Sequence, residues 1–411
     1  MNLYLIIFNS GVYKEKQVYT SHKTLFSELE KYFTIHLINY RDVDNIPTNA
    51  YKMAFIASGG VEAPVIRNFS ILPYPITLLT DGTGNSLAAS LEIAAWIRSK
   101  DMKVNIIQGT PESIIHKVLI HHQAFAAKRS LKGKKIGVIG TPSSWLVASH
   151  VDYLLAGQRW GVSYQDYSLR EVVKRFHAIT DDEVGVEASL VATHCHSCIE
   201  TTPENLLRAM RLYKAIRNMC EDYQLDAVTY SCFSLINELK TTGCLALSLL
   251  NEEGIPAGNE GDLQSIMTLL MTKELTHSSG FIANPTFINE QDNEISLAHC
   301  TISPSMTENF TLRPYEDTGI GISVQGSMPT GEITLFKCGG ECLDEYFVSA
   351  GTLTENIEDS LSHRTQIKVT LEKSVNYFLN NPLGNHHILM RGNHTEAINA
   401  LMNQNQCKIR E

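Results

Sequence analysis

The 411-residue sequence predicts an α/β protein with two parallel-sheet domains followed by a β-rich, antiparallel barrel-like C-terminal domain. Three observations support this class. Short apolar runs alternate with segments of helical spacing over the first third of the chain, and the alternation starts again near residue 133. After residue 280 the helical spacing fades, and short β-rich runs separated by Gly, Pro and Asn replace it. One core rarely serves more than about 250–300 residues, so this length favours two to three domains.

The first predicted domain, residues 1–132, should contain an open and mostly parallel sheet. Strands are expected at residues 3–8, 34–38, 53–57, 76–79 and 104–107, and helices at 21–32, 87–99 and 111–126. Sheets of this kind bind ligands at the carboxyl ends of their strands. The Gly-rich turn at residues 81–86 lacks the full dinucleotide fingerprint, and the chain has no phosphate-binding loop sequence, so NAD and ATP are disfavoured.

The second predicted domain, residues 133–280, begins after a short polar, basic segment and opens with a strand at 136–140. Further strands are expected at 227–231 and 255–258, and helices at 206–223, 236–250 and from 263 onward. The third domain, residues 281–411, should be an antiparallel sheet or small barrel. Its expected strands are 295–298, 321–325, 332–336, 346–349 and 366–370, and a helix at 396–402 closes the chain.

Composition and charge narrow the class of function. The chain is 43% hydrophobic and 19% charged, which is ordinary for a globular protein. A net charge of -10 without a basic run argues against a nucleic-acid partner, because phosphate binding needs clustered Lys and Arg. No stretch approaches the roughly 20 apolar residues of a membrane helix. Nine scattered cysteines, an odd number, fit a reducing compartment. We therefore expect a cytoplasmic protein without a membrane partner.

The densest candidate site is the run Gly-Asn-Glu-Gly-Asp at residues 258–262, which follows an extended segment and opens a helix. In extended backbone, side chains two residues apart point to the same side, so Glu260 and Asp262 could aim two carboxylates at one divalent cation. The competing interpretation is structural. Asp262 would cap the helix that begins at Leu263, and Glu260 would be solvated.

Histidines supply the second set of candidates. Two adjacent histidines in the run Gly-Asn-His-His at 384–387 should point to opposite sides of an extended stretch, so only one can face a given site. Neutral imidazole is a common metal ligand and a ready acid or base, although a turn histidine satisfied by backbone groups is the simpler explanation. His299, at the end of a strand, could be a ligand or a substrate donor. Its neighbour Cys300 fits a small buried residue better than a nucleophile.

Two cysteine motifs are weaker signals. The run Thr-His-Cys-His-Ser-Cys at residues 193–198 looks like half of a zinc site, but no second pair lies at finger spacing. The run Cys-Gly-Gly-Glu-Cys at 338–342 fits a turn with two free thiols. Neither motif predicts a function.

The order of these motifs resembles a known family. Residues 137–149, 226–229, 232–233, 242–247, 254–258, 260–262, 297–301 and 384–387 carry the resemblance. Together they resemble L-fucose isomerase-like proteins, which are relatives of L-fucose and L-arabinose isomerases. The resemblance implies two Rossmann-like domains and a β-rich C-terminal domain. It also implies an intramolecular oxidoreductase of carbohydrate metabolism that interconverts an aldose and a ketose through an ene-diol(ate), using Mn²⁺ or another divalent cation.

The same resemblance implies roles for particular residues. The family's E-x-D run matches residues 260–262, so Asp262 and Glu260 are expected at the metal. The family's Asn-His pair matches Asn385 and His386, which makes His386 a metal ligand. We expect Asn385 and His299 to orient hydroxyl groups of the substrate. His299 matches a substrate- or metal-binding histidine. Glu238 is by position the nearest match to an upstream Glu that acts as ligand and base, so Glu260 and Glu238 are both candidate bases.

Family members are similar in forming homo-oligomers in which a neighbouring N-terminal domain helps to complete the site. A trimer or hexamer with a small-molecule sugar substrate is therefore implied. Three positions depart from the family pattern: Ser234 stands where an acidic residue is usual, Asn259 replaces Cys, and a His-Phe-Glu-Ser-Gly-like run is replaced by one that begins at Tyr315. These departures leave two alternatives open. One is a non-catalytic sugar-binding or regulatory protein, and the other is a metal-dependent lyase or epimerase.

Overall fold

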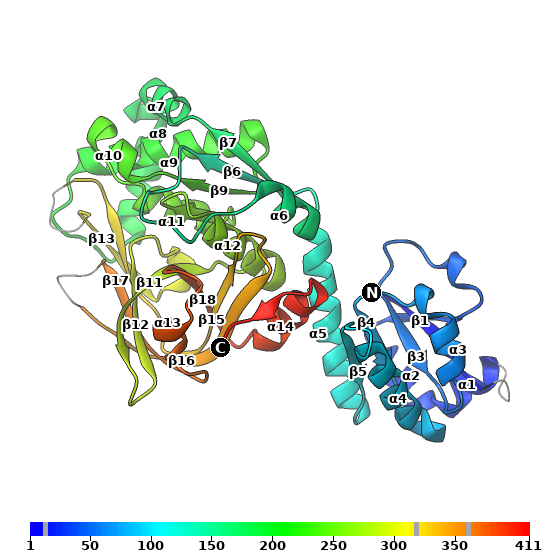
Figure 1. The fold of residues 1–411 in the computed structure, drawn as a ribbon. Coiled ribbons are helices and arrows are strands. Elements are labelled where there is room, and N and C mark those ends of the chain that lie inside the picture. Colours follow the sequence, from blue (N-terminus) through cyan, green and yellow to red (C-terminus); the bar gives the residue numbers. More distant parts are fainter. Residues whose placement is uncertain (11–14, 316–319, 359–362) are drawn as a thin grey trace. The chain divides into compact units, whose positions relative to one another are not determined.

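A computed structural model describes the chain except for residues 11–14, 316–319 and 359–362. The chain forms two compact units, which are residues 1–126 with 403–406 and residues 127–402 with 407–411 (Figure 1). Both the second predicted domain and the β-rich segment lie largely in the second unit. The predicted boundaries at 132 and 280 stay predictions.

The first unit contains a five-stranded parallel sheet, as the alternating pattern predicts. Its strands are β1 (Asn2–Phe8), β2 (Thr34–Asn39), β3 (Lys52–Ile56), β4 (Ile76–Leu79) and β5 (Val104–Ile107), in the order β2-β1-β3-β4-β5. This is the order of doubly wound sheets whose direction of winding changes between β1 and β3. Its Rossmann-like character, which only the family resemblance implies, stays a prediction.

Both faces of this sheet are apolar because helices cover both. Alternate residues of β1 divide between two cores: Leu3 and Leu5 belong to one, and Ile6 and Phe8 to the other. The surrounding helices are α1 (Glu15–Ser21), α2 (Lys23–Leu29), α3 (Glu62–Arg67), α4 (Ser86–Arg98) and α5 (Pro111–Ser130), the last of which runs on into the second unit.

The second unit begins with a four-stranded parallel sheet. The strands are β6 (Lys135–Ile139), β7 (Ser163–Tyr167), β9 (Ala227–Tyr230) and β10 (Ala257–Asn259), in the order β10-β9-β6-β7. Helices α6 (Tyr153–Trp160), α7 (Leu169–Ala178), α8 (Asp181–His194) and α9 (Pro203–Tyr223) belong to this part. Sequence patterns did not predict β7 or the helices α6 to α8. Much of α8 is exposed, so few of its positions carry the apolar spacing that marks a helix.

The single helix predicted at 236–250 is wrong, because two helices occupy this segment. They are α10 (Phe233–Leu239) and α11 (Cys244–Glu252). Lys240 adopts the left-handed conformation with φ +51° and ends α10. Gly243 lies so close to Tyr230 that a Cβ there would be 1.0 Å from the tyrosine hydroxyl. Tertiary packing therefore interrupts a segment whose apolar spacing alone is continuous.

The β-rich segment forms a closed barrel, which confirms the antiparallel expectation. Six strands follow one another as β15 (Gly331–Gly339), β18 (His387–Arg391), β11 (Phe281–Asn289), β12 (Glu294–His299), β17 (Thr365–Leu371) and β16 (Glu345–Asn356), and pairing of β16 with β15 closes the ring. Strand β19 (Lys408–Ile409) adds to β16, and β14 (Ser323–Ser327), β13 (Asn309–Arg313) and β8 (Ser197–Cys198) form a small separate sheet. The helices of this part are α13 (Tyr377–Asn380) and α14 (Thr395–Gln404).

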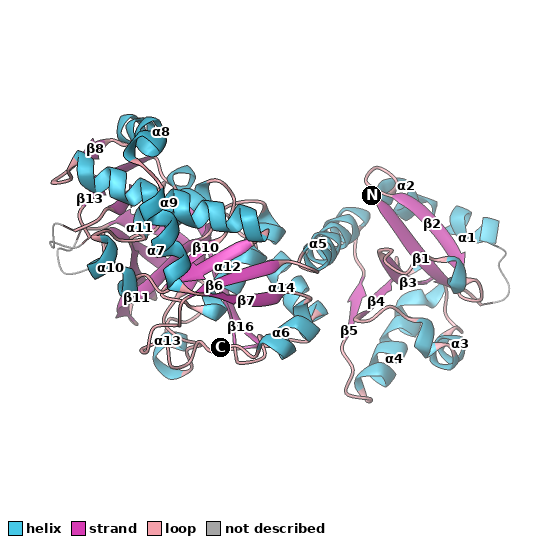
Figure 2. Ribbon diagram, turned by 90° about the horizontal axis from the view of Figure 1, so that it is seen from above, coloured by secondary structure: helices cyan, strands magenta, loops and turns pink. Residues whose placement is uncertain are grey.

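Helix α12 (Leu263–Thr276) lies between the parallel sheet and the barrel (Figure 2). Its residues from Leu263 to Thr272 are all buried, because β9 and β10 contact it on one side and β15 and β18 on the other. One apolar core runs through both parts and includes Val228 of the sheet and Leu335 of the barrel. The start of α12 is therefore a fixed point at which sheet and barrel residues can meet. Among the described residues, no helix is long and apolar enough to cross a membrane.

Two glycine substitutions test the packing that separates α10 from α11. In Gly243→Ala the new methyl group meets the Tyr230 hydroxyl, and we expect a loss of about 1–3 kcal/mol in the free energy of unfolding. Gly185 in α8 has no atom within 4 Å of an added Cβ. Gly185→Ala should therefore stabilise the protein by about 0.5–1 kcal/mol through helix propensity. Urea titration measures both, and equal midpoints for the two variants would contradict this packing.

Candidate metal centre and active site

The turn between β10 and α12 places Glu260. Glu260 and Gly261 have φ values of +63° and +72°, so the backbone here is left-handed. The expectation of an extended 260–262 segment with both carboxylates on one side is therefore wrong. At Gly261 a Cβ would lie 2.7 Å from the Cα of Pro142, so only glycine fits. A left-handed glutamate costs about 1–3 kcal/mol and is typical of functional sites.

The Glu260 carboxylate is held on both oxygens. Glu260 is only 6% exposed, so the interpretation of Glu260 as a solvated side chain is wrong. The Trp145 indole N–H donates to Oε2 over 2.6 Å, and Asn259 Nδ2 donates to Oε1 over 3.2 Å. The backbone carbonyl of Glu260 accepts a hydrogen bond from the Ser143 N–H. The carboxylate is therefore buried, but its polar atoms have partners.

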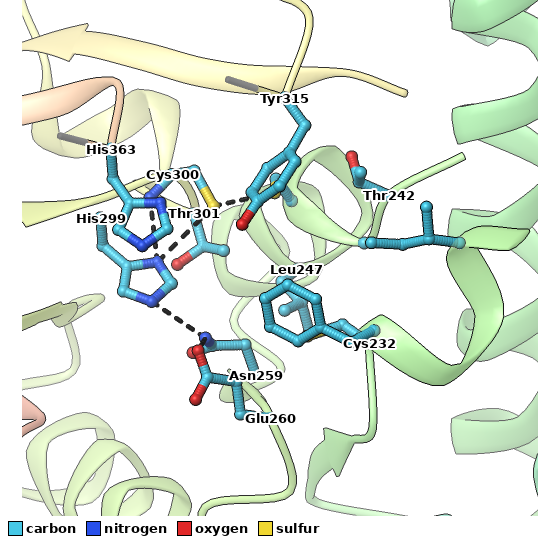
Figure 3. Close-up of a pocket in the computed structure, with 14 residues that line it drawn as sticks. Cys232, Thr242, Leu247, Asn259, Glu260, His299, Cys300, Thr301, Tyr315 and His363 are labelled. Atoms are coloured by element: carbon cyan, nitrogen blue, oxygen red, sulfur yellow. Dashed lines mark hydrogen bonds between the residues drawn. The ribbon is translucent and has the colours of Figure 1, made fainter. Parts of the chain in front are cut away.

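Three buried side chains converge on one point. Glu260, His299 and His386 each offer one ligand atom, and these atoms lie within 4.8 Å of one another. They come from the turn after β10, from the end of β12 and from the residue before β18. In Figure 3, His299 lies between His363 on one side and Asn259 with Glu260 on the other. A carboxylate and two imidazoles at this spacing are a set of donors suited to a divalent metal ion.

His386 is oriented by Asp262. His386 Nδ1 lies 2.9 Å from Asp262 Oδ2, and because a carboxylate only accepts, Nδ1 carries the proton. The other ring nitrogen, Nε2, is then an acceptor, and it is buried with no hydrogen-bond partner among the described residues. A histidine whose second nitrogen is held by a carboxylate is the usual arrangement of a metal-ligating imidazole.

The neighbouring His387 faces the other way, as the extended pattern predicts. His387 Nε2 lies 3.1 Å from the Tyr377 hydroxyl, and Nδ1 donates to the carbonyl of Asn385. Burial lowers the pKa of His387 to about 3. Only His386 of this pair can serve the cluster.

Asp262 lies behind His386 and begins α12. Its Oδ1 accepts the Ser265 N–H over 2.8 Å, so the helix-cap interpretation is confirmed. Its Oδ2 also accepts from the Ser265 hydroxyl. Burial acts to raise the pKa of the Asp262 carboxyl, but Lys337 and the hydrogen bond with His386 outweigh it and hold this pKa below its usual range. A direct metal contact of Asp262 stays a prediction.

Lys337 is a buried cation that sequence reasoning missed. It lies on β15 with no exposed surface, donates from Nζ to the Ser265 hydroxyl over 3.0 Å, and lies 3.8 Å from Asp262 Oδ2. Burial lowers the pKa of Lys337, and the Asp262 carboxylate opposes this. The available signal was a lone lysine in the otherwise apolar run at residues 335–338.

His299 is a neutral, buried imidazole. Donors lie next to both of its nitrogens: the Cys300 N–H is 2.9 Å from Nδ1, and Asn259 Nδ2 is 2.9 Å from Nε2. A neutral ring accepts at one nitrogen only, so the tautomer decides which of the two donors is bonded. Burial, with a smaller effect of His386 and His363, holds the pKa of His299 well below its usual range. The uncharged form is the one that binds a metal ion. His363 stacks on it with ring centroids 5.0 Å apart, and no sequence motif pointed to His363.

A pocket opens beside this cluster (Figure 3). Its described lining combines apolar side chains and thiols with the polar cluster: Cys232, Phe233, Ile236, Thr242, Gly243, Cys244, Leu247, Asn259, Glu260, His299, Cys300, Thr301, Tyr315 and His363. Among these lining residues Glu260 is the one carboxylate. Cys300 is buried with its sulfur 2.8 Å from that of Cys244, in keeping with a small core residue.

Four predicted site residues lie outside this pocket lining. Asp262 and His386 are buried beside it, whereas the other two are exposed. Glu238 is exposed on α10, and Asn385 is exposed and donates to the Asn284 side chain over 3.1 Å. Their predicted roles remain untested. Of the three departures from the family pattern, Asn259 and Tyr315 line the pocket, whereas the Ser234 hydroxyl is 3.0 Å from that of Ser231. Among the residues that the structure describes, the histidines and cysteines of 193–198 form no group of three metal donors.

Fold and site together define a class: an α/β protein with a closed antiparallel barrel and a carboxylate–imidazole cluster where the two meet. No protein-family model matches the chain. One curated relative, a sulfoquinovose isomerase from Clostridium sp. (strain MSTE9), is 24% identical over 266 residues, which cover 62% of this chain. The chain thus spans 59% of the length of that relative.

The solved structures that match this chain do so at low TM-scores. D-threo-3-hydroxyaspartate dehydratase from Delftia sp. HT23 shares 10% identity, with 98% of this chain and 85% of that chain covered, but at a TM-score of 0.16. Two mutant forms of the same dehydratase reach TM-scores of 0.16 and 0.15.

A double-mutant cycle tests the buried Asp262–Lys337 pair. Lys337→Met leaves the Asp262 charge without its cation, and breaking a buried ion pair costs about 3–5 kcal/mol. The combined Asp262→Asn, Lys337→Met variant should recover part of that loss, with a coupling of about 0.5–3 kcal/mol in denaturant titrations. Strictly additive losses would show that the two charges do not interact.

Proposed function

We propose that the protein is an aldose–ketose isomerase that acts on a sugar through an ene-diol(ate), with Mn²⁺ or another divalent cation as cofactor. The observation that carries this proposal is the convergence of Glu260, His299 and His386, with His386 Nε2 buried and lacking a partner among the described residues. The similarity to a sulfoquinovose isomerase supports the reaction class. The family resemblance of the ordered motifs, which include these three residues, also supports it.

The residues present fit a divalent cation. A buried acceptor without a partner costs free energy, which a cation at His386 Nε2 would remove. Glu260, His299 and His386 would hold the ion, and Asp262 would fix His386 from behind or provide a further oxygen. Imidazole donors favour first-row transition metals, and the carboxylate also suits harder ions such as Mn²⁺, so the mixed set fits a divalent cation of this group.

The reaction moves a proton between C1 and C2 of the sugar. When bound, the divalent cation polarises the substrate oxygens and offsets the negative charge of the ene-diolate. Glu260 is our candidate to carry the proton, because it is the one carboxylate among the described pocket-lining residues. Glu238 remains the alternative base, although its exposed position on α10 favours Glu260.

The remaining pocket residues would bind and shield the sugar. Asn259, Tyr315 and His363 present hydrogen-bonding groups beside the cluster. The apolar wall, to which Phe233 and Leu247 belong, would exclude water from the ene-diolate. Asn385 is also a proposed substrate-binding residue, although it is not among the described residues that line the pocket. Sulfoquinovose is the first sugar to assay. The proposal also includes a homo-oligomer, either a trimer or a hexamer, and a cytoplasmic location.

Two adjacent histidines provide a matched test of the metal site. In a calorimetric Mn²⁺ titration, His386→Gln should bind Mn²⁺ at least about tenfold more weakly. The substitution removes the ligand nitrogen and the hydrogen bond between the imidazole and Asp262. His387→Gln is the control. His387 faces Tyr377 and not the cluster, so this variant should have the Mn²⁺ affinity of wild type. Asp262→Asn should also weaken binding. If the wild-type protein binds no Mn²⁺, the metal-dependent proposal fails and the sugar-binding alternative gains support.

Turnover separates the two candidate bases. Glu260→Gln should lower kcat by about 10²–10⁴-fold because glutamine neither accepts the proton nor offers the cation a charged oxygen, whereas Glu238→Gln should change it less than threefold, about 0.7 kcal/mol in barrier. The assay follows aldose and ketose by chromatography in D₂O, where isomerisation through an ene-diol can place deuterium on the carbon that receives the proton. An epimer or a carbon–carbon cleavage product would instead identify an epimerase or a lyase.

A further inference from the structure

Trp145 combines high exposure with a buried hydrogen bond. Its side chain belongs to a residue that is 54% exposed, yet its indole N–H reaches the buried Glu260 carboxylate over 2.6 Å. By contrast, Trp160 is a core residue whose indole donates to the Leu343 carbonyl. Exposing a large aromatic ring forgoes most of the free energy of its burial. Packing therefore does not explain why an indole stands at position 145.

The loop that carries Trp145 is fastened to the turn that carries Glu260. The Ser143 N–H donates to the Glu260 carbonyl over 2.8 Å, and Pro142 packs against Gly261 so closely that no Cβ fits there. These contacts join the segment after β6 to the segment after β10. The backbone that carries the indole is therefore hydrogen-bonded to, and packed against, the turn that carries the carboxylate.

The indole bond completes the fixation of the carboxylate. Asn259 holds Oε1 and Trp145 holds Oε2, so rotation of the Glu260 carboxyl group would break at least one of the two hydrogen bonds. The indole ring is itself steadied by an edge-to-face contact with Phe233, with ring centroids 5.3 Å apart. Metal ligands must be held within about 0.5 Å of their productive geometry, and hydrogen bonds from behind usually do this.

We propose that Trp145 is a positioning residue that orients Glu260 toward the cation through its indole N–H. This inference rests on the proposed function, because it assigns Glu260 to the metal centre. The part of Trp145 that matters for this role is the indole N–H, which donates to Glu260. The neighbouring ring contact with Phe233 contributes little to metal affinity.

Trp145→Phe isolates the indole N–H, because phenylalanine keeps an aromatic ring beside Phe233 and removes the donor. In a calorimetric Mn²⁺ titration of the full-length protein, we expect the Kd to rise about 10–100-fold. Trp96→Phe is the matched control, since Trp96 lies on α4 of the first unit and contacts Phe69. Its Mn²⁺ affinity should equal that of wild type. Because Trp145 is exposed, Trp145→Phe should keep the wild-type circular dichroism spectrum.

Tryptophan fluorescence reports whether Mn²⁺ binds beside Trp145. The chain has three tryptophans, and paramagnetic Mn²⁺ at Glu260 should quench the indole bonded to that carboxylate. At saturating Mn²⁺ the quenching should persist in Trp96→Phe and largely disappear in Trp145→Phe. Wild-type binding with an unchanged Kd in Trp145→Phe would overturn the inference and leave the proposed metal centre intact. If wild type binds no Mn²⁺, the metal centre fails, and the role of Trp145 fails with it.

Discussion

The buried carboxylate of Asp262 is the interaction on which the second unit depends most. It caps α12 through Ser265, accepts from His386 and lies beside the Lys337 ammonium, and none of the three charged or ionisable side chains is exposed. A buried ion costs several kcal/mol unless it is paired and hydrogen-bonded. The start of the helix, the barrel strand β15 and the residue before β18 therefore have to meet at one place. That requirement ties the parallel sheet to the barrel.

The candidate metal centre is a consequence of the same interaction. With Nδ1 engaged by Asp262, His386 presents Nε2 to Glu260 and His299. Burial holds the pKa of His299 well below its usual range and so favours the neutral, ligating imidazole. The left-handed turn at Glu260 brings the carboxylate to the cluster while Asp262 turns away into the helix cap. Two carboxylates that are close in sequence thus take different positions.

Sequence patterns predicted much of the secondary structure and little of the contact geometry. The strands of the first sheet are apolar runs because both faces are buried, and this makes them easy to find. Helices α10 and α11 look like one helix in the sequence because the close approach of Gly243 to the distant Tyr230 hydroxyl leaves no local signal. The exposed helix α8 was missed because its sequence lacks a wide apolar stripe. Local patterns fail where the deciding contact is not local.

The sequence by itself determined the order of sheets and barrel and the identity of Glu260, Asp262, His299 and His386 as candidate site residues, because strand spacing and residue chemistry are local properties. Only the tertiary structure decided their arrangement. His386 and Asp262 are 124 residues apart, and Trp145 and Glu260 are 115 apart, so no spacing rule connects them. Lys337, His363 and Trp145 belong to the site for the same reason. Their partners come from other strands and turns, and packing of the sheet against the barrel brings them together.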